Sequence, residues 1–174
     1  IEPKTHQFPS EILKEVLFND YVKNTAFLSG PSFAQEIAQG LPASVTLAGP
    51  NLQTIEKIRN LVERDNFEVI LSSDVIGVEL AGAMKNVLAI GIGIIDGLRL
   101  GESAKAAFLA KGLAEMAHLA EKMGGNSKSM LGLCGVGDLV LTSTSNLSRN
   151  RRVGLKLATG IALEQILHEI GETA

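Results

Sequence analysis

The sequence has no tryptophan, one tyrosine and one cysteine among its 174 residues. The single cysteine, Cys134, excludes an internal disulfide and is typical of a reducing compartment. Net charge is also small, at −3, which excludes a general electrostatic field for nucleic acid or for acidic membranes. Hydrophobic residues make up 45% and charged residues 20%, so the composition predicts a globular chain with a buried core.

Long uninterrupted apolar runs are missing too. The longest apolar stretch, residues 75–98, contains Glu79, Lys85 and Asp96, and its uncharged part is half of the ~20 residues that a membrane span needs. Residues 1–10 are polar and show no signal peptide. We therefore expect a cytoplasmic protein with a buried central helix and no stable membrane insertion. Its three histidines are scattered without the spacing of metal ligands, so no metal site is expected.

The first 73 residues alternate between helix and strand patterns. Strands are predicted at 25–28, 43–47 and 67–71, and helices at 10–18, 33–38 and 51–64, with Ser10 expected to cap the first helix. Strands separated by helices favour a parallel α/β sheet. Three strands are too few for a complete doubly wound domain, so this part is interpreted as the tail of a Rossmann-like parallel sheet.

After Asp74 the strand signal stops. Asp74 is expected to cap a long helix at 75–98, and an amphipathic helix at 102–123 should end at Gly124-Gly125. Residues 130–142 are interrupted by glycines and 143–147 form a polar loop. Ser148 is expected to cap a helix at 149–158, and a last helix is predicted at 162–170. The pattern predicts an α/β part over 1–73 and an all-helical domain over 74–174.

Lys85 is the most informative polar residue of the long helix. Its helical neighbours Ala81, Gly82 and Ala89 are small and leave room for a ligand or for a close helix. An apolar environment disfavours the charged form of a lysine, which suits proton transfer. The alternative is a core-helix lysine whose amine reaches the surface, and spacing alone favours that alternative.

Three other segments have open interpretations. The basic run at 148–152 begins a helix, where free N–H groups and arginine favour phosphate, but a solvated cluster or pairing with acids is equally consistent. Asp138 follows two glycines, so it could be a turn residue or could orient a lysine. Residues 30–32 lie between a strand and a helix, where ligands bind in open sheets and where ordinary turns also occur. Glycines at 91–93 and 135–137 imitate a dinucleotide fingerprint without its third glycine.

Five segments together are far more specific. They are GPSFA at 30–34, VIGVEL at 75–80 running into Lys85 and Asn86, GLAEM at 112–116, GDL at 137–139 and SNLSRNRR at 145–152. In this order and spacing the sequence closely resembles the bacterial-type NAD(P)-dependent glycerol-3-phosphate dehydrogenases, from about residue 8 to its end. The resemblance implies that residues 1–73 are the C-terminal part of a dinucleotide-binding domain. It also implies that residues 74–174 form a helical substrate and catalytic domain like that of 6-phosphogluconate dehydrogenase.

The resemblance further implies interconversion of dihydroxyacetone phosphate and sn-glycerol 3-phosphate for glycerophospholipid synthesis. NAD or NADP would be the cofactor, the partner would be a small phosphorylated substrate, and a homodimer is one candidate assembly. Lys85 matches the proton acceptor, with Asp138 as the second catalytic residue. Ala34 and Arg149 match cofactor contacts. The implied substrate contacts are Gly30, Ser32, Lys85, Asn86, Asp138, Thr142, Ser148, Arg149 and Asn150.

Other parts of the family pattern are expected outside this sequence. The glycine-rich first turn and a second substrate lysine should precede residue 1, and a cofactor-contacting glutamate should follow residue 174, so Glu172 is not expected to take that role. We therefore expect these residues alone to bind NAD(P) poorly and to be inactive, with the choice between NADH and NADPH made elsewhere. The alternatives are another 3-hydroxyacid or sugar-acid dehydrogenase of the same superfamily, or a non-catalytic helical dimerisation domain. The basic cluster favours a phosphorylated substrate.

Overall fold

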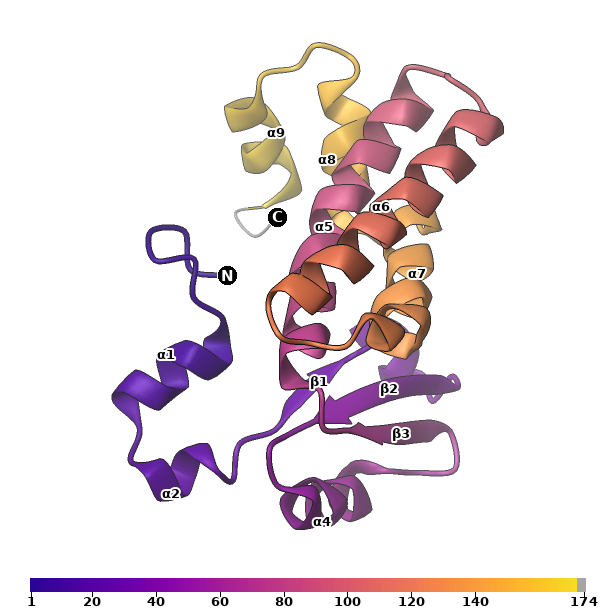
Figure 1. Cartoon of the computed structure of the whole chain (residues 1–174). Helices are drawn as coiled ribbons and strands as arrows, with labels where there is room; N and C mark the ends of the chain where they lie inside the picture. Colours follow the sequence, from indigo (N-terminus) through magenta and orange to yellow (C-terminus); the bar gives the residue numbers. More distant parts are fainter. Residues whose placement is uncertain (172–174) are drawn as a thin grey trace.

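A small sheet lies beneath a set of longer helices, and two short helices form an arm beside them (Figure 1). The computed structural model describes residues 1–171, except for the side chains of residues 19 and 20; Glu172 and the end of the predicted helical domain lie outside the described residues. The first part contains α1 (Pro9–Val16), α2 (Asn19–Val22), β1 (Phe27–Ser29), α3 (Ala34–Ala38), β2 (Ala43–Ala48), α4 (Leu52–Val62) and β3 (Phe67–Ser72). The second part contains α5 (Val75–Gly97), α6 (Glu102–Lys122), the 3₁₀ turn η1 (Ser127–Leu131), the π-helical turn η2 (Leu133–Gly137), α7 (Asp138–Thr144), α8 (Arg149–Leu157) and α9 (Leu163–Ile170). The predicted order of an α/β tail followed by helices is confirmed.

The sheet is mixed, which corrects the expectation of a parallel one. Its order is β1-β2-β3, and β2 pairs with β3 in parallel through the crossover helix α4. β1 instead runs antiparallel to β2, with Leu28 opposite Leu47. A parallel connection needs an element that packs back across the sheet face. Between β1 and β2 there is only the five-residue α3, which has no buried residue, so the chain turns and re-enters beside the same end of β1.

The two faces of β2 contribute to different hydrophobic clusters. Val45 and Leu47 pack with Ile55 of α4 and Val69 of β3 beneath the sheet. Ala48 belongs to the larger cluster above it, which includes Leu80, Met116, Met130 and Leu139. Alternate residues of a strand point to opposite faces, so the short β2 joins both clusters. Cys134 lies in the upper cluster, where burial raises the pKa of its thiol, as expected for a core residue.

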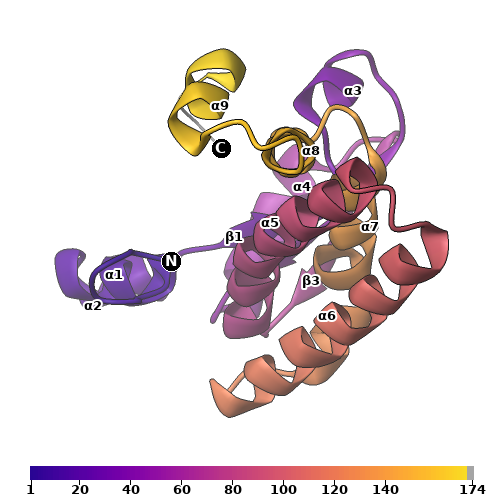
Figure 2. The same cartoon turned by 90° about the horizontal axis from the view of Figure 1, so that it is seen from above.

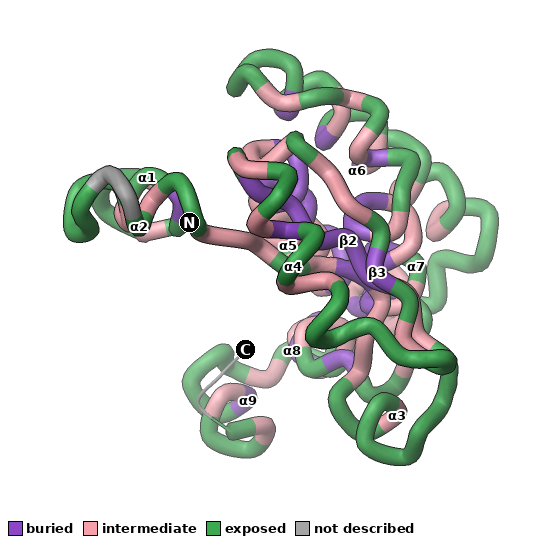
Figure 3. The backbone as a smooth tube through the Cα atoms, turned by 90° about the horizontal axis from the view of Figure 1, so that it is seen from below, coloured by how far each residue is buried: buried purple, intermediate pink, exposed green. Residues whose placement is uncertain are grey.

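Helix α5 lies at the centre of the helical part, between α6, α7 and α8 (Figures 1 and 2). Asp74 caps it as predicted, because its Oδ1 accepts from the Gly77 N–H at 3.0 Å. By length and composition α5 is the one described helix that could cross a membrane. Figure 3 shows, however, buried segments along α5, and its buried residues Leu80 and Leu88 belong to the cluster that includes Ala48 of β2 and Met116 of α6. Its charged residues Glu79, Lys85 and Asp96 all have polar partners, so its surroundings are those of a core helix.

Helix α1 begins earlier than predicted, and Ser10 does not cap it. The proline ring at Pro9 already has the backbone angle of a first helical residue, so the cap position falls on Phe8. The Glu11 carboxylate accepts from the Phe8 N–H at 2.8 Å. Ser10 lies inside the helix, where its N–H and Oγ both donate to Glu79 of α5, at 2.8 and 2.5 Å. The other predicted helices and strands lie within two residues of their observed bounds, whereas α2, η1, η2 and α7 were not predicted.

Candidate active site

The amine of Lys85 and the carboxylate of Asp138 form an ion pair. Lys85 Nζ lies 2.5 Å from Asp138 Oδ2, and only 3% of the Asp138 side chain is exposed, against 23% for Lys85. The amine therefore has a buried anionic partner, and the lysine side chain is still partly exposed to solvent. That combination fits a group that exchanges a proton with a ligand while a fixed acid holds its position. It differs from the alternative of a lysine extended freely to the surface.

The backbone before Asp138 is tightly folded, which fixes the acid. Residues 133–137 form a π-helical turn, a feature frequently found at functional sites. An added Cβ at Gly135 would lie 2.2 Å from the Met130 carbonyl oxygen, so glycine is required there. The second carboxylate oxygen of Asp138 accepts from the buried Thr142 Oγ1 at 3.1 Å. With both oxygens bonded, the carboxylate has one orientation, toward Lys85.

Helix α8 brings the basic cluster close to the ion pair of Lys85 and Asp138. Asn150 Nδ2 donates to Asn86 Oδ1 at 2.9 Å, and these residues directly follow Arg149 and Lys85 in sequence. The helix begins as predicted, because Ser148 Oγ accepts from the Arg151 N–H at 3.2 Å. The N-terminus of a helix favours an anion, because its first backbone N–H groups have no partner within the helix and point outward. The N-terminus of α8 and the Lys85 pair therefore adjoin each other.

The residues that follow β1 lie beside the site on the side of the sheet. Gly30 has a φ of 154°, and an added Cβ would lie 2.9 Å from the Val45 Cα, so a side chain is excluded. Ser32 Oγ donates to the Gly30 carbonyl at 3.0 Å and shapes the turn. Pro31 lies 3.6 Å from the Cβ position of Gly137, immediately before Asp138. The strand end thus packs against the turn that presents the acid.

Two hollows border these residues. One, of about 490 Å³, lies between the arm, β1 and α5 and is lined partly by Ser29, Gly82 and Asn86. The other, of about 410 Å³, is lined by Phe33, Ala34, Gln35, Asn146, Leu147, Arg149 and Arg152. Ala34 and Arg149, the two predicted cofactor contacts, therefore share one hollow. A small side chain beside cationic ones suits a large anionic ligand.

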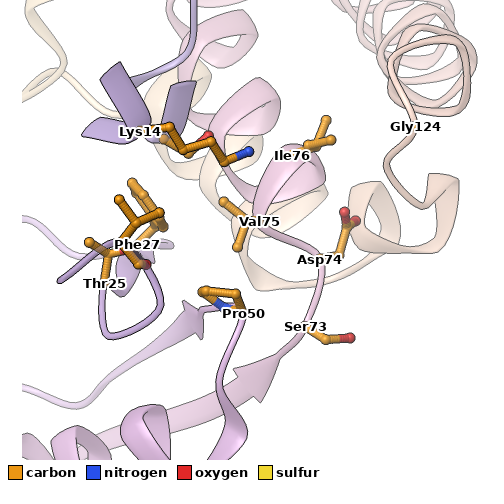
Figure 4. A pocket seen from close by; sticks show the side chains of 11 residues that line it. Lys14, Thr25, Phe27, Pro50, Ser73, Asp74, Val75, Ile76 and Gly124 are labelled. Atoms are coloured by element: carbon orange, nitrogen blue, oxygen red, sulfur yellow. Dashed lines mark hydrogen bonds between the residues drawn. The ribbon is translucent and has the colours of Figure 1, made fainter. Parts of the chain in front are cut away.

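A third cavity, of about 270 Å³, lies at the start of α5 (Figure 4). Lys14 of α1 and Asp74 line different sides of it, together with Thr25, Pro50 and Val75. Val75 precedes Lys85 by ten residues, which is about 15 Å along a helix. This cavity is thus separate from the predicted site. The glycines at 91 and 93 that imitate a fingerprint are helix-packing positions instead: an added Cβ at Gly91 would lie 2.5 Å from Phe108, and one at Gly93 would lie 2.2 Å from the Arg151 carbonyl oxygen.

One group of polar residues was not predicted. Arg151 bonds Asp96 Oδ2 through Nε at 3.1 Å and through Nη2 at 2.6 Å, and Lys105 Nζ lies 2.6 Å from the other oxygen. Burial opposes ionisation of Asp96, yet the hydrogen bonds from Lys105 and Arg151 hold the pKa of its carboxyl below its usual value. The same bond raises the pKa of Lys105. The signal that could have indicated this group is the basic start of α8, because cations at a helix N-terminus are unfavourable unless an acid offsets them.

Comparisons with known proteins agree with this geometry. Residues 74–174 match the family model for the NAD-dependent glycerol-3-phosphate dehydrogenase C-terminus, and residues 1–55 match the model for its N-terminus. Glycerol-3-phosphate dehydrogenase (NAD(P)+) of Herminiimonas arsenicoxydans is 49% identical over 173 residues, which is 99% of this chain and 52% of that protein. The enzyme of the same name from Polynucleobacter asymbioticus is 47% identical, with 100% and 52% covered. The chain therefore spans about half the length of the curated relatives it matches.

Solved structures give the same assignment. The crystal structure of glycerol-3-phosphate dehydrogenase from Coxiella burnetii superposes with a TM-score of 0.83 at 46% identity, covering 85% of this chain and 46% of that one. The enzyme from Saccharomyces cerevisiae superposes with a TM-score of 0.73 at 29% identity, covering 82% and 43%. This chain belongs to the NAD-dependent glycerol-3-phosphate dehydrogenase family.

Proposed function

We propose that the protein containing this chain interconverts dihydroxyacetone phosphate and sn-glycerol 3-phosphate. The main support is the 2.5 Å ion pair of Lys85 and Asp138 beside the N-terminus of α8. A group able to exchange a proton, beside residues suited to phosphate, is what the reaction of a small phosphorylated ketone requires. The names of the relatives support the same substrate.

In this proposal Lys85 handles the proton. In the reducing direction its ammonium group donates a proton to the C2 oxygen as that oxygen becomes an alcohol, and in the oxidising direction its amine accepts the proton. Asp138 holds the amine in position and balances the charge of the ammonium form. Because Thr142 bonds the other oxygen of Asp138, the carboxylate cannot turn away. Thr142, which bonds Asp138, and Asn86, which bonds Asn150, would then lie close to the substrate.

The start of α8 would bind the phosphate. Arg149 offers a planar group with two parallel N–H donors, and the N-terminus of α8, capped by Ser148, offers backbone N–H groups. Asn150 is held by Asn86 at 2.9 Å, so it stands between the phosphate end and Lys85. Gly30 and Ser32 would meet the substrate from the sheet side.

The hollow at Ala34 and Arg149 fits part of a nicotinamide dinucleotide, because Ala34 leaves space and Arg149 with Arg152 offers positive charge to its phosphates. When bound, the cofactor supplies or takes up the hydride at C2. In this proposal residues 1–73 belong to the dinucleotide-binding domain and 74–174 to the substrate domain, and the protein works in the cytoplasm. The buried Cys134, which forms no disulfide, supports that compartment.

The test is a turnover assay of the full-length protein. Purified enzyme should oxidise NADH or NADPH when dihydroxyacetone phosphate is added, and should reduce NAD(P) with sn-glycerol 3-phosphate. Sugar acids and 3-hydroxyacids without phosphate serve as controls and should give much slower turnover. Turnover with a 3-hydroxyacid but none with dihydroxyacetone phosphate would assign the protein to another branch of the superfamily.

A further inference from the structure

The unpredicted group around Asp96 connects three helices and one turn. Asp96 is next to the last residue of α5, Lys105 lies in the first turns of α6, and Arg151 lies in the first turn of α8. Arg151 also donates from Nη1 to Asn146 Oδ1 at 2.7 Å, in the turn between α7 and α8. All three nitrogens of its guanidinium group are thus bonded within the protein, and its side chain is 14% exposed.

This bonding gives Arg151 a role different from that of its basic neighbours. A cation at a helix N-terminus is unfavourable, and Asp96 offsets that cost for Arg151. Arg149 and Arg152, by contrast, line the hollow that contains Ala34. Asn146 lines the same hollow, so the bond from Arg151 Nη1 holds one wall of it.

Arg151 also fixes how α8 is rotated. It follows Asn150, whose amide bonds Asn86 beside Lys85. If the bonds to Asp96 were lost, the first turn of α8 could rotate or fray, and Asn150 and Arg149 would move with it. Misplacing a binding group by ~1 Å can cost ~100-fold in catalytic efficiency.

We propose that Arg151 is a positioning residue, anchored by Asp96 and holding Asn146, that orients Arg149 and Asn150 toward the substrate phosphate. Lys105 supports it by fixing the other oxygen of Asp96. The proposal rests on the proposed function, because it requires a phosphorylated substrate at the start of α8. It predicts that loss of the guanidinium group of Arg151 weakens substrate binding more than it slows the chemical step.

The experiment uses full-length enzyme with the variant Arg151→Lys, which keeps the charge but cannot bond Asp96 and Asn146 together. We expect KM for dihydroxyacetone phosphate to rise roughly tenfold with kcat within about threefold, because the phosphate is gripped less well while Lys85 and Asp138 are intact. The matched control is Lys156→Gln, which removes the ion pair of α8 with Glu169 at the other end of the helix. Its KM should stay within about twofold of the wild-type value.

Two results would overturn the proposal: a folded Arg151→Lys enzyme with wild-type KM, or an equal rise of KM in Lys156→Gln. If Arg151→Lys does not fold, Asn146→Ala decides, since it removes the bond of Arg151 to the turn and leaves both bonds to Asp96 in place. We expect a roughly threefold rise of KM for Asn146→Ala, and an unchanged KM would refute the role of Arg151. Wild-type enzyme inactive with dihydroxyacetone phosphate would instead refute the proposed function itself.

Discussion

Asn150 and Asn86, 64 residues apart, share a 2.9 Å hydrogen bond that joins the first turn of α8 to the middle of α5. Each follows a basic residue in sequence, Arg149 and Lys85 respectively. The bond therefore links the helix start suited to phosphate with the ion pair suited to proton exchange.

Lys85→Met in the full-length enzyme should separate folding from chemistry. Methionine keeps most of the side-chain length and the helix propensity, so the helix should survive. The proton donor is lost, and general acid–base catalysis is typically worth ~10²–10⁴-fold, so kcat should fall at least about a hundredfold. Steady-state kinetics and circular dichroism check this, with the exposed Lys122→Met as control. A folded Lys85→Met enzyme with near-normal kcat would refute the proton role.

Asp138→Asn should act through Lys85. The amide keeps the size of the side chain but loses the charge that faces the amine, so we expect kcat to fall by roughly 10–100-fold. In an enzyme that already has Lys85→Met, the same change should reduce kcat by less than about threefold, because residues acting as a unit are not additive. Fully multiplicative effects in this double-mutant cycle would show that Asp138 works independently of Lys85.

Gly154→Ala should loosen α8 from α5. An added Cβ would lie 2.1 Å from the Ile90 carbonyl oxygen and 2.8 Å from the Gly93 Cα, both backbone atoms that cannot move aside. We expect a loss of roughly 1–3 kcal/mol in the free energy of unfolding, typical of overpacking. Urea titration measures it. Gly132→Ala, whose Cβ would make an ordinary 3.5 Å contact, should change stability by less than about 0.5 kcal/mol.

Asp96→Asn should destabilise the protein in a pH-dependent way. The folded-state pKa of Asp96 is lowered, since the bonds from Lys105 and Arg151 outweigh burial. Its contribution is therefore complete above the ordinary aspartate pKa of about 3.9 and is lost as the pH falls through the lower folded value. The difference in Tm between wild type and variant should be largest near neutral pH and shrink below about pH 4. A difference independent of pH would mean that Asp96 acts through packing alone.

Local sequence signals predicted most of the helices and strands. Asp74 and Ser148 cap α5 and α8 as expected, because a cap depends on residues three positions away. The start of α1 was misplaced because Pro9 is already its first residue, and Ser10 bonds Glu79, 69 residues later, and does not cap the helix. The predicted direction of β1 was also wrong. The helix predicted at 33–38 was already short for a crossover between parallel strands, but its length was not used to decide the direction.

In the candidate site, too, contacts between residues distant in sequence were not predicted from local patterns. Spacing alone favoured a Lys85 that only reaches the surface, because its partner Asp138 lies 53 residues away, beyond any local pattern. The resemblance to the family singled out both residues, and the structure brings them together. Asp96 was noted only as a charge that interrupts an apolar run, because its two cationic partners come from other helices.

The position of β2 between two hydrophobic clusters has a thermodynamic consequence. Val45 and Leu47 pack on one side of the strand and Ala48 on the other, so neither cluster can melt without exposing apolar surface of the other. The boundary near residue 73 marks a change of secondary structure, whereas the cooperative unit extends across it. Unfolding of the sheet and of the central helices should therefore be one coupled transition. A destabilising substitution near α4 would also lower the stability of the helices that contain Lys85 and Arg149.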